Sequence, residues 1–226
     1  MKQGGSDAVK RAAGESAAEL VEDRMVVGLG TGSTTAHAIR AIGRQVDAGL
    51  DIVGVPTSFQ SRALAREVGV PLAELDEVSV DLAIDGADEV ANGDLIKGGG
   101  AAHAREKIVD ASADRFVVVA DPTKTAETLS HPVPLEVLPA ARTTVADAVR
   151  ALGGDAELRQ AERKDGPVVT DNGNLVLDCA FGEIPEPATL GANLAALPGV
   201  VEHGLFVGLA DAVHVGTDGG VTVTEL

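Results

Sequence analysis

The sequence predicts an α/β protein with two domains, one built on an open parallel sheet and a smaller one of the α+β type. Between Met25 and Ala120, short runs rich in Val, Ile and Leu alternate with helical patterns, which is typical of a parallel sheet covered by helices. These runs lack strict polar alternation, as expected for strands buried on both faces. After about residue 127 the pattern changes to a ferredoxin-like order of strands and helices.

The first domain is predicted to comprise residues 1–127 and 206–226. Its strands are expected at 25–29, 51–55, 80–84 and 115–120, and its helices at 34–44, 58–68 and 101–111. The stretches "DAVHVGT" and "GVTVTEL" near the end of the chain are expected to return to this sheet. A chain of 226 residues is long enough for one large or two small domains.

The second domain is predicted to comprise residues 128–205. The three prolines of "HPVPLEVLP" suit a linker that enters an edge strand. Strands are then expected at 133–137, 157–161, 174–179 and 200–207, with helices at 143–152 and 188–197. The segment "DNGN" predicts the tight turn of a hairpin, because Asn-Gly readily adopts positive φ angles.

The charge of the chain restricts its partners. Asp and Glu number 35 against 18 Lys and Arg, so the formal net charge is −17. This charge repels nucleic acids and anionic membrane surfaces, and we expect neither as a partner. So much acid on an ordinary soluble composition suggests a protein adapted to molar salt, where screening weakens self-repulsion.

The cysteine count and the hydropathy pattern indicate a cytoplasmic protein. Cys179 is the single cysteine, so it cannot form an internal disulfide, and we expect a buried thiol. The N-terminal sequence lacks the apolar stretch of a signal peptide, and no run of 18 apolar residues occurs.

The stretch "GLGTGSTT" indicates an anion site. It lies between a predicted strand and a predicted helix, where free N–H groups and the helix dipole attract a negative charge. Ser33 stands where a dinucleotide fingerprint needs glycine, and the Gly-Lys of a Walker loop is missing. A hydroxyl-lined loop for one phosphate remains, with Thr31, Ser33 and Thr34 as donors. The alternative is a glycine turn with a Ser/Thr helix cap.

The stretch "DGADEV" places three acidic residues at the end of another predicted strand. Asp85, Asp88 and Glu89 would lie at the same carboxyl edge of the sheet as the glycine-rich loop. Three interpretations remain open for them at this point: a divalent metal site, a helix cap, or hydrogen bonds to the hydroxyls of a polyol.

The stretch "LIKGGGAAHAREKIVD" combines a flexible loop with reactive side chains. Gly98, Gly99 and Gly100 let the backbone approach a ligand closely and present N–H groups to oxygen atoms. Lys97 before them and Glu106 after them suit an electrophile and a base. The alternative is a glycine-rich helix entry with a solvated charged face. Lys124, in "VADPTK", is either a second phosphate contact or a surface lysine.

These motifs, followed by "VVTDNGN" and "PGVVEHGLF" in this order, resemble the type A family of ribose-5-phosphate isomerases over nearly the whole chain. The resemblance implies interconversion of D-ribose 5-phosphate and D-ribulose 5-phosphate in the non-oxidative pentose phosphate pathway, without metal or organic cofactor. It also implies a Rossmann-like catalytic domain completed by the C-terminal segment. The α+β domain would contribute to assembly of a homodimer or homotetramer.

The resemblance also implies roles for individual residues. By position, Glu106 matches the catalytic base, Lys97 begins the third substrate-binding segment, and Lys124 matches a basic residue near the substrate. The remaining substrate-binding positions are Thr31, Gly32, Ser33 and Thr34, then Asp85, Gly86, Ala87 and Asp88, then Gly98, Gly99 and Gly100. Asp85 is the candidate for opening the sugar ring and Asp88 for orienting hydroxyls, and the two roles are interchangeable at this point.

Two positions fit the family pattern less well. Lys10 is a candidate for a lysine near the phosphate, but the helix around it is generic. His103 stands beside the glycine loop, where the family usually carries an uncharged residue, and we expect it to face solvent.

Two other functions remain as alternatives. One is an amino-sugar phosphate isomerase/deaminase on a similar fold. The other is a sugar-phosphate sensor without catalytic activity, although no basic DNA-binding extension is visible.

Overall fold

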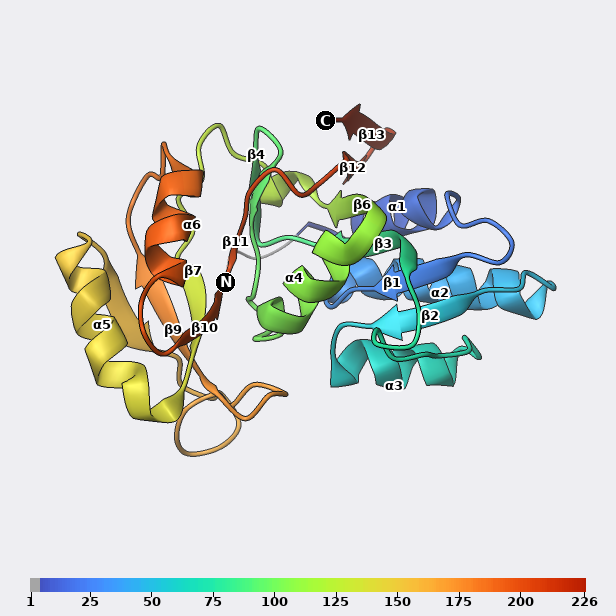
Figure 1. Ribbon diagram of the computed structural model, residues 1–226. Helices are drawn as coiled ribbons and strands as arrows, with labels where there is room; N and C mark the ends of the chain where they lie inside the picture. Colours follow the sequence, from blue (N-terminus) through green and yellow to red (C-terminus); the bar gives the residue numbers. More distant parts are fainter. Residues whose placement is uncertain (1–4) are drawn as a thin grey trace. The chain divides into compact units, whose positions relative to one another are not determined.

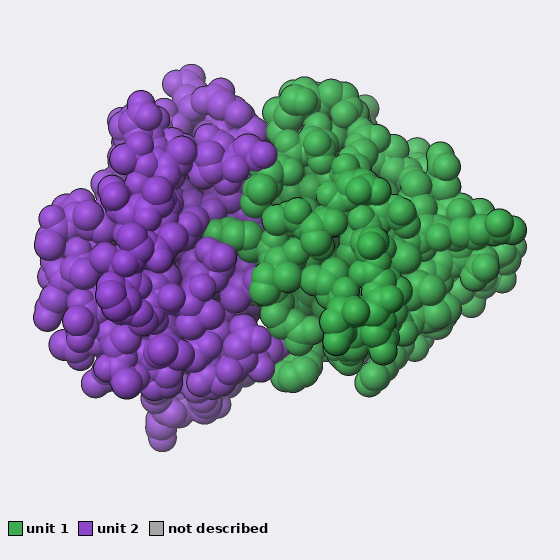
Figure 2. All heavy atoms as spheres, viewed as in Figure 1, with its two compact units in different colours: residues 1–87, 105–125, 209–226 green, residues 88–104, 126–208 purple. Residues whose placement is uncertain are grey.

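The computed structural model describes residues 5–226 (Figure 1). The chain divides into two compact units, coloured separately in Figure 2. Unit 1 comprises the residues up to 87, 105–125 and 209–226, and unit 2 comprises 88–104 and 126–208. Residues 88–104, which the sequence analysis places in the first domain, group with the second unit. The chain therefore leaves unit 1 directly after Ala87 and re-enters it at Arg105.

Unit 1 contains a six-stranded sheet in the order β13-β12-β6-β3-β1-β2 (Figure 1). Its strands are β1 (Val26–Leu29), β2 (Val53–Pro56), β3 (Val80–Gly86), β6 (Ala113–Ala120), β12 (Ala212–Thr217) and β13 (Gly220–Glu225). All neighbours are parallel except β13, which pairs antiparallel with β12 at the edge. The open parallel sheet and the return of the C-terminal strands are confirmed.

Helices cover both faces of this sheet (Figure 1). They are α1 (Asp7–Ala18), α2 (Ser33–Asp47), α3 (Phe59–Glu67) and α4 (His103–Ser112), with a 3₁₀ turn η1 (Pro122–Lys124). Leu29 and Ile84 belong to the core that contains Ile39 of α2. Side chains alternate across a strand, so Gly28 faces the other way, where a Cβ would lie 2.8 Å from Val109 of α4. Glycine at this position lets α4 pack directly on the strand.

Unit 2 contains the predicted ferredoxin-like sheet, with antiparallel strands in the order β10-β7-β9-β8. Its elements are β7 (Val133–Val137), η2 (Pro139–Ala141), α5 (Arg142–Ala151), β8 (Asp155–Leu158), β9 (Leu175–Ala180), α6 (Pro187–Ala195) and β10 (Val200–His203). Strand β8 begins two residues earlier than predicted. The helices and the other three strands begin within one residue of their predicted positions.

The strand predicted at 200–207 is in fact two strands. After β10, the two-residue strand β11 (Leu205–Phe206) joins a separate three-stranded sheet with β4 (Glu89–Ala91) and β5 (Asp94–Ile96). This small sheet was not predicted from the sequence. Gly204 makes the break: its N–H donates to the Pro134 carbonyl, and its own carbonyl accepts from the Lys97 N–H. A Cβ here would lie 2.2 Å from the Lys97 carbonyl oxygen, so only glycine fits.

The "DNGN" turn is fixed by a buried carboxylate. Glu136 of β7 is fully buried and accepts hydrogen bonds from the hydroxyl of Thr170 (2.9 Å) and the side-chain amides of Asn172 (3.0 Å) and Asn174 (2.8 Å). Gly173 takes a φ of +84°, as expected for the Asn-Gly turn. A buried carboxylate needs several donors, and the turn supplies them.

Two further expectations concern Cys179 and the membrane. Cys179 is buried in the core of unit 2, and burial raises the pKa of its thiol to about 12, so the expected buried thiol is confirmed. Among residues 5–226, the helices are all too short or too polar to cross a membrane.

His214 of β12 couples the stability of unit 1 to pH. Its side chain is buried, and Nδ1 lies 3.0 Å from the hydroxyl of Ser16 on α1. Burial is the main reason that the pKa of His214 falls below 6.5; the positive charge of Arg115 lowers it further, while Glu225 and Glu19 oppose the shift. The unfolded chain therefore binds the proton at a higher pH than the folded chain does.

Replacing His214 by Gln should reduce the loss in the free energy of unfolding that occurs as the pH is lowered. Above about pH 7.5, one unit above the ordinary histidine pKa of 6.5, the histidine is almost entirely neutral in both states, and its contribution is constant. As the pH falls below that value, the unfolded state protonates first, so wild type should lose up to about 1.4 kcal/mol per pH unit from this group. Urea unfolding at pH 5–8 in constant salt measures the difference between wild type and variant. A difference that does not change with pH would contradict this assignment.

Candidate active site

The carboxylate of Asp85 joins two loops at the carboxyl edge of the sheet in unit 1. Its Oδ1 accepts hydrogen bonds from the N–H groups of Thr31 (2.9 Å) and Gly86 (2.6 Å). Asp85 is fully buried at the end of β3, and a Cβ at residue 30 would lie 2.1 Å from its Oδ1. Gly30 is therefore required for the carboxylate to reach the Thr31 N–H.

The predicted phosphate loop lies at the start of α2. Gly32, with φ +128°, is the N-cap, so no side chain caps the first turn, which begins at Ser33. The first N–H groups of a helix have no partner within the helix and favour an anion. Ser33 is exposed and Thr34 is buried. This geometry suits a phosphate whose oxygens take the place of a cap.

The sequence analysis missed two hydroxyls beside this loop. The hydroxyl of Thr31 lies 2.9 Å from that of Thr57 and 2.7 Å from that of Ser58. Both residues follow β2, and Ser58 also caps α3 by accepting from the Ser61 N–H. A "PTS" sequence directly after a parallel strand was the available signal, because the ends of neighbouring parallel strands share one edge.

Three more candidates belong to unit 1. Glu106 is in the first turn of α4 and only 3% exposed. Lys124 is half-buried at the end of η1, whose first turn is capped by Asp121 through the N–H (2.9 Å) and hydroxyl (2.6 Å) of Thr123. Burial works to raise the pKa of Asp121, but these hydrogen bonds and the charge of Lys10 lower it overall. Lys10 and the Lys124 turn thus act on the same carboxylate.

In unit 2, Lys97 is held at the junction of two strands. Its N–H donates to the carbonyl of Gly204 (2.8 Å), and its Nζ lies 5.3 Å from the centroid of the Phe206 ring. The residue is only 2% exposed. The aromatic face attracts the ammonium group and offsets part of the cost of withdrawing it from water.

Asp88 and the glycine loop form a second set of contacts in unit 2. The N–H of Gly99 donates to Oδ2 of Asp88 (2.6 Å), and a Cβ at residue 99 would lie 2.5 Å from the same carboxylate. Gly98 has φ +105°, in the region that favours glycine, while Gly100 is exposed. Each acidic side chain of "DGAD" thus binds the backbone of a different glycine loop, and the half-buried Ala87 lies between them in the chain.

The expectation that His103 faces solvent is wrong. The residue is fully buried, and its Nε2 accepts a hydrogen bond from the Glu136 N–H (3.1 Å). The pairing of β10 with β7 shifts register between Val200 and Glu202, so the imidazole provides the acceptor where the ladder is irregular. On its other side the ring packs against Gly98, where a Cβ would lie 2.7 Å from Nδ1. The His103 ring therefore packs directly against the backbone of the glycine loop and helps to fix its position.

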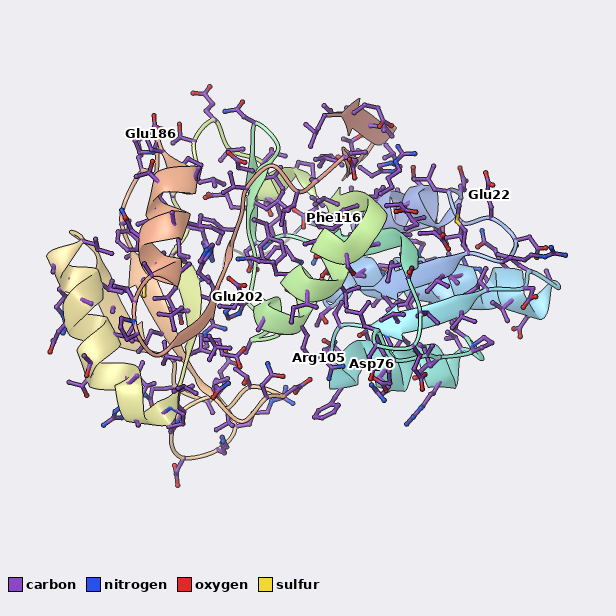
Figure 3. All side chains as sticks on the ribbon, viewed as in Figure 1. Glu22, Asp76, Arg105, Phe116, Glu186 and Glu202 are labelled. Atoms are coloured by element: carbon purple, nitrogen blue, oxygen red, sulfur yellow. The ribbon has the colours of Figure 1, made fainter. Side chains whose placement is uncertain are left out.

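A pocket of about 370 Å³ in unit 1 does not contain the predicted site residues. Its lining residues are Val55, Pro56, Glu74, Leu75, Asp76, Arg105, Ile108 and Val109. Arg105 of α4 and Asp76 of the loop after α3 lie on the same side of the sheet (Figure 3). Glu74 pairs with Arg62 (2.6 Å) and lies 3.9 Å from Arg105. The positive charge of Arg105 at this pocket is therefore partly neutralised. In the described part of the chain, no three His, Cys, Asp or Glu side chains are arranged to hold a metal ion.

Comparison with known proteins shows which family this chain resembles. Residues 53–220 match the family model described as ribose 5-phosphate isomerase A (phosphoriboisomerase A). A ribose-5-phosphate isomerase A of Haloarcula marismortui is 78% identical, and the match covers 100% of this chain and 99% of the relative. The solved structure of ribose 5-phosphate isomerase A from Methanocaldococcus jannaschii is 44% identical, with a TM-score of 0.93 and coverage of 96% and 98%.

A second solved structure contains a ligand. It is a D-ribose-5-phosphate isomerase in complex with phospho-erythronic acid, 45% identical, with a TM-score of 0.94 over 96% of this chain and 98% of that one.

Replacing Gly30 by Ala should displace Asp85. The new methyl group would overlap the carboxylate, and overpacking of this kind costs about 1–3 kcal/mol. Loss of the bond to the Thr31 N–H should then speed hydrogen exchange of that amide by roughly tenfold or more. Gly219→Ala is the matched control, because the nearest atom to its Cβ would be 3.9 Å away. Equal exchange rates in the two variants would refute the role given to Gly30.

Proposed function

Since the chain belongs to the ribose 5-phosphate isomerase A family and interconverts D-ribose 5-phosphate and D-ribulose 5-phosphate, we propose that Glu106 carries the proton in this reaction. The reaction is a step of the pentose phosphate pathway. It requires ring opening, removal of the proton from C2, a cis-enediolate, and return of a proton to C1. One carboxylate can reach two adjacent carbons, so a single base serves both transfers.

The burial of two opposite charges within one short motif carries this proposal. Lys97 is 2% exposed and Glu106 is 3% exposed, although they are only nine positions apart in the chain. Withdrawing an ammonium group and a carboxylate from water is costly, and proteins keep such groups mainly where chemistry needs them. A glycine loop between them adds backbone donors without adding side-chain bulk.

Lys97 is assigned to the carbonyl oxygen at which negative charge develops. An ammonium group in a site shielded from water stabilises an oxyanion more strongly than it would in bulk solvent. The N–H groups of the glycine loop assist it. Phospho-erythronic acid, the ligand in the related structure, has a planar carboxylate that resembles the two oxygens of an enediolate, which supports this assignment.

The phosphate is assigned to the loop Thr31–Thr34 at the start of α2, with Lys124 as the counter-charge and Lys10 as a further contact. The uncapped first turn and the cluster of three hydroxyls formed by Thr31, Thr57 and Ser58 support this assignment. Anchoring the phosphate far from the reacting carbons uses binding energy to orient the sugar over the base.

The two aspartates are assigned to the sugar itself. Asp85 serves ring opening, because it is buried and fixed by two N–H donors, which hold its carboxylate in one orientation. Asp88 orients hydroxyl groups beside the glycine loop, to which it is bonded. Every step in this scheme is a proton transfer or a hydrogen bond, so none of them calls for a metal or an organic cofactor.

We infer a homodimer or homotetramer formed through unit 2, where Leu138, Leu152 and Val201 are large apolar side chains exposed to between 39% and 50%. A cytoplasmic location agrees with the substrate, a phosphorylated sugar of central metabolism. Light scattering coupled to size-exclusion chromatography in molar KCl measures the oligomeric state directly.

Replacing Glu106 by Gln should abolish turnover while sparing binding. We expect kcat/KM to fall by roughly 10³-fold or more, since general acid–base catalysis contributes about 10²–10⁴-fold. Affinity for phospho-erythronic acid should change far less. The assay follows ribose 5-phosphate by NMR in D₂O with molar KCl and EDTA, where wild type should form ribulose 5-phosphate deuterated at C1.

Glu67→Gln is the control, because Glu67 is exposed at the end of α3 and the substitution removes the same charge. This variant should retain wild-type turnover. Near-normal activity of Glu106→Gln would remove Glu106 from the mechanism.

We also infer that the acidic composition adapts the chain to salt. The net charge is −17, and the Haloarcula relative comes from a halophilic archaeon. Raising KCl from 0.1 to 3 M shortens the Debye length from about 10 Å to below 3 Å, which screens repulsion between exposed carboxylates. The thermal unfolding midpoint and kcat/KM should therefore both rise with KCl. Indifference of both quantities to salt would refute the inference.

A further inference from the structure

Arg159 links the glycine loop to the sheet of unit 2. Arg159 follows β8, and two nitrogens of its guanidinium donate hydrogen bonds to the carboxylate of Asp178 on β9. Nε donates to Oδ2 at 2.8 Å, and Nη2 donates to Oδ1. The third nitrogen, Nη1, donates to the carbonyl oxygens of Gly98 (2.9 Å) and Gly99 (3.1 Å). One side chain thus spans 60 residues of sequence to reach two successive peptide groups of the loop.

These two hydrogen bonds orient peptide planes. In a trans peptide the carbonyl and the following N–H point in opposite directions, and the described chain contains no cis peptide. The plane between Gly98 and Gly99 is held at both ends, by Arg159 at the carbonyl and by Asp88 at the N–H. In the next plane, Arg159 holds the Gly99 carbonyl and so turns the Gly100 N–H away from the guanidinium.

We propose that Arg159, held by Asp178, is a positioning residue of the isomerase, which orients the N–H group of Gly100 toward the oxygens of the enediolate. The proposal rests on the role given above to this loop. Arg159 does not touch the reacting atoms in this scheme. It acts through the peptide group between Gly99 and Gly100, whose carbonyl it binds.

The contacts require an arginine. A guanidinium presents five donors in a rigid planar fork, so it can bind a carboxylate along one edge and carbonyl oxygens with the remaining nitrogen. The ammonium of a lysine is a point donor and cannot span both partners in the same geometry. The loop is also restrained at two points, because His103 packs against Gly98 and Asp88 lies beside Gly99.

The side chain can be removed without dismantling the local backbone. The Arg159 N–H donates to the Val176 carbonyl, and its carbonyl accepts from the Val168 N–H, both at 2.9 Å. These main-chain bonds remain when the guanidinium is lost. The side chain of Arg159 is 16% exposed and that of Asp178 is 32% exposed, so water can solvate the remaining partner. We therefore expect Arg159 variants to fold.

The test compares Arg159→Met and Arg159→Lys with Arg150→Met. Arg150 of α5 is the matched control: it lies in the same unit, also pairs with an aspartate (Asp147, 2.8 Å), and its loss changes the net charge equally. Both Arg159 variants should lose roughly 10- to 100-fold in kcat with less than about threefold change in KM. The reason is that a misplaced N–H donor loses more of its hydrogen-bond energy with the transition state than with the bound substrate. The control should keep wild-type kinetics.

Two further readouts separate positioning from general damage. Affinity for phospho-erythronic acid should fall in parallel with kcat in the Met and Lys variants. Activity of Arg159→Ala should recover at least fivefold with millimolar propylguanidinium, and the recovery should saturate. If Arg159→Met does not fold, Asp178→Asn, which keeps the guanidinium but weakens its anchor, should show the same kcat loss in smaller measure.

The proposal fails if Arg159→Met folds and keeps kcat within threefold of wild type. It also fails if kcat declines only in proportion to the folded fraction. Either result leaves the assignment of Glu106 intact, because that assignment depends on the Glu106→Gln experiment. Failure of the site assignment itself would instead show as normal turnover by Glu106→Gln.

Discussion

The two hydrogen bonds to Asp85 are the constraint on which the organisation of unit 1 around its site depends. A carboxylate at the end of β3 accepts from Thr31 and Gly86, and so fixes the loop that leads into α2. That loop gives α2 an uncapped first turn for an anion. This contact requires glycine at residue 30, because any side chain there would overlap the Asp85 carboxylate. The glycine at position 30 and the acid 55 residues later in the sequence are therefore required together.

Unit 2 applies the same principle to the glycine loop that precedes α4. Backbone N–H groups are useful in catalysis only when they are held still, since a donor that reorganises during the reaction loses most of its advantage. Asp88, His103 and Arg159 restrain the glycine loop from three sides. The glycines of this loop thus allow neighbouring side chains to approach the backbone closely, and they do not serve to make the loop mobile.

The sequence was sufficient for elements whose signals are local. The parallel sheet, the ferredoxin-like order, and the Asn-Gly turn each depend on residues close together in the chain, and all are present. Contacts across long separations were not predictable. Arg159 meets Gly98 across 61 positions, and His103 is buried because a register shift in β10 leaves an N–H that its ring can bind.

The "VVTDNGN" segment illustrates how a recognisable motif can be structural rather than catalytic. Its Thr and Asn side chains all bind Glu136, whose own N–H donates to His103, and His103 in turn packs beneath Gly98. The turn is therefore connected to the glycine loop through a chain of contacts within unit 2. A buried polar group without a partner destabilises the fold, so each side chain in such a chain of contacts stabilises the position of the next one.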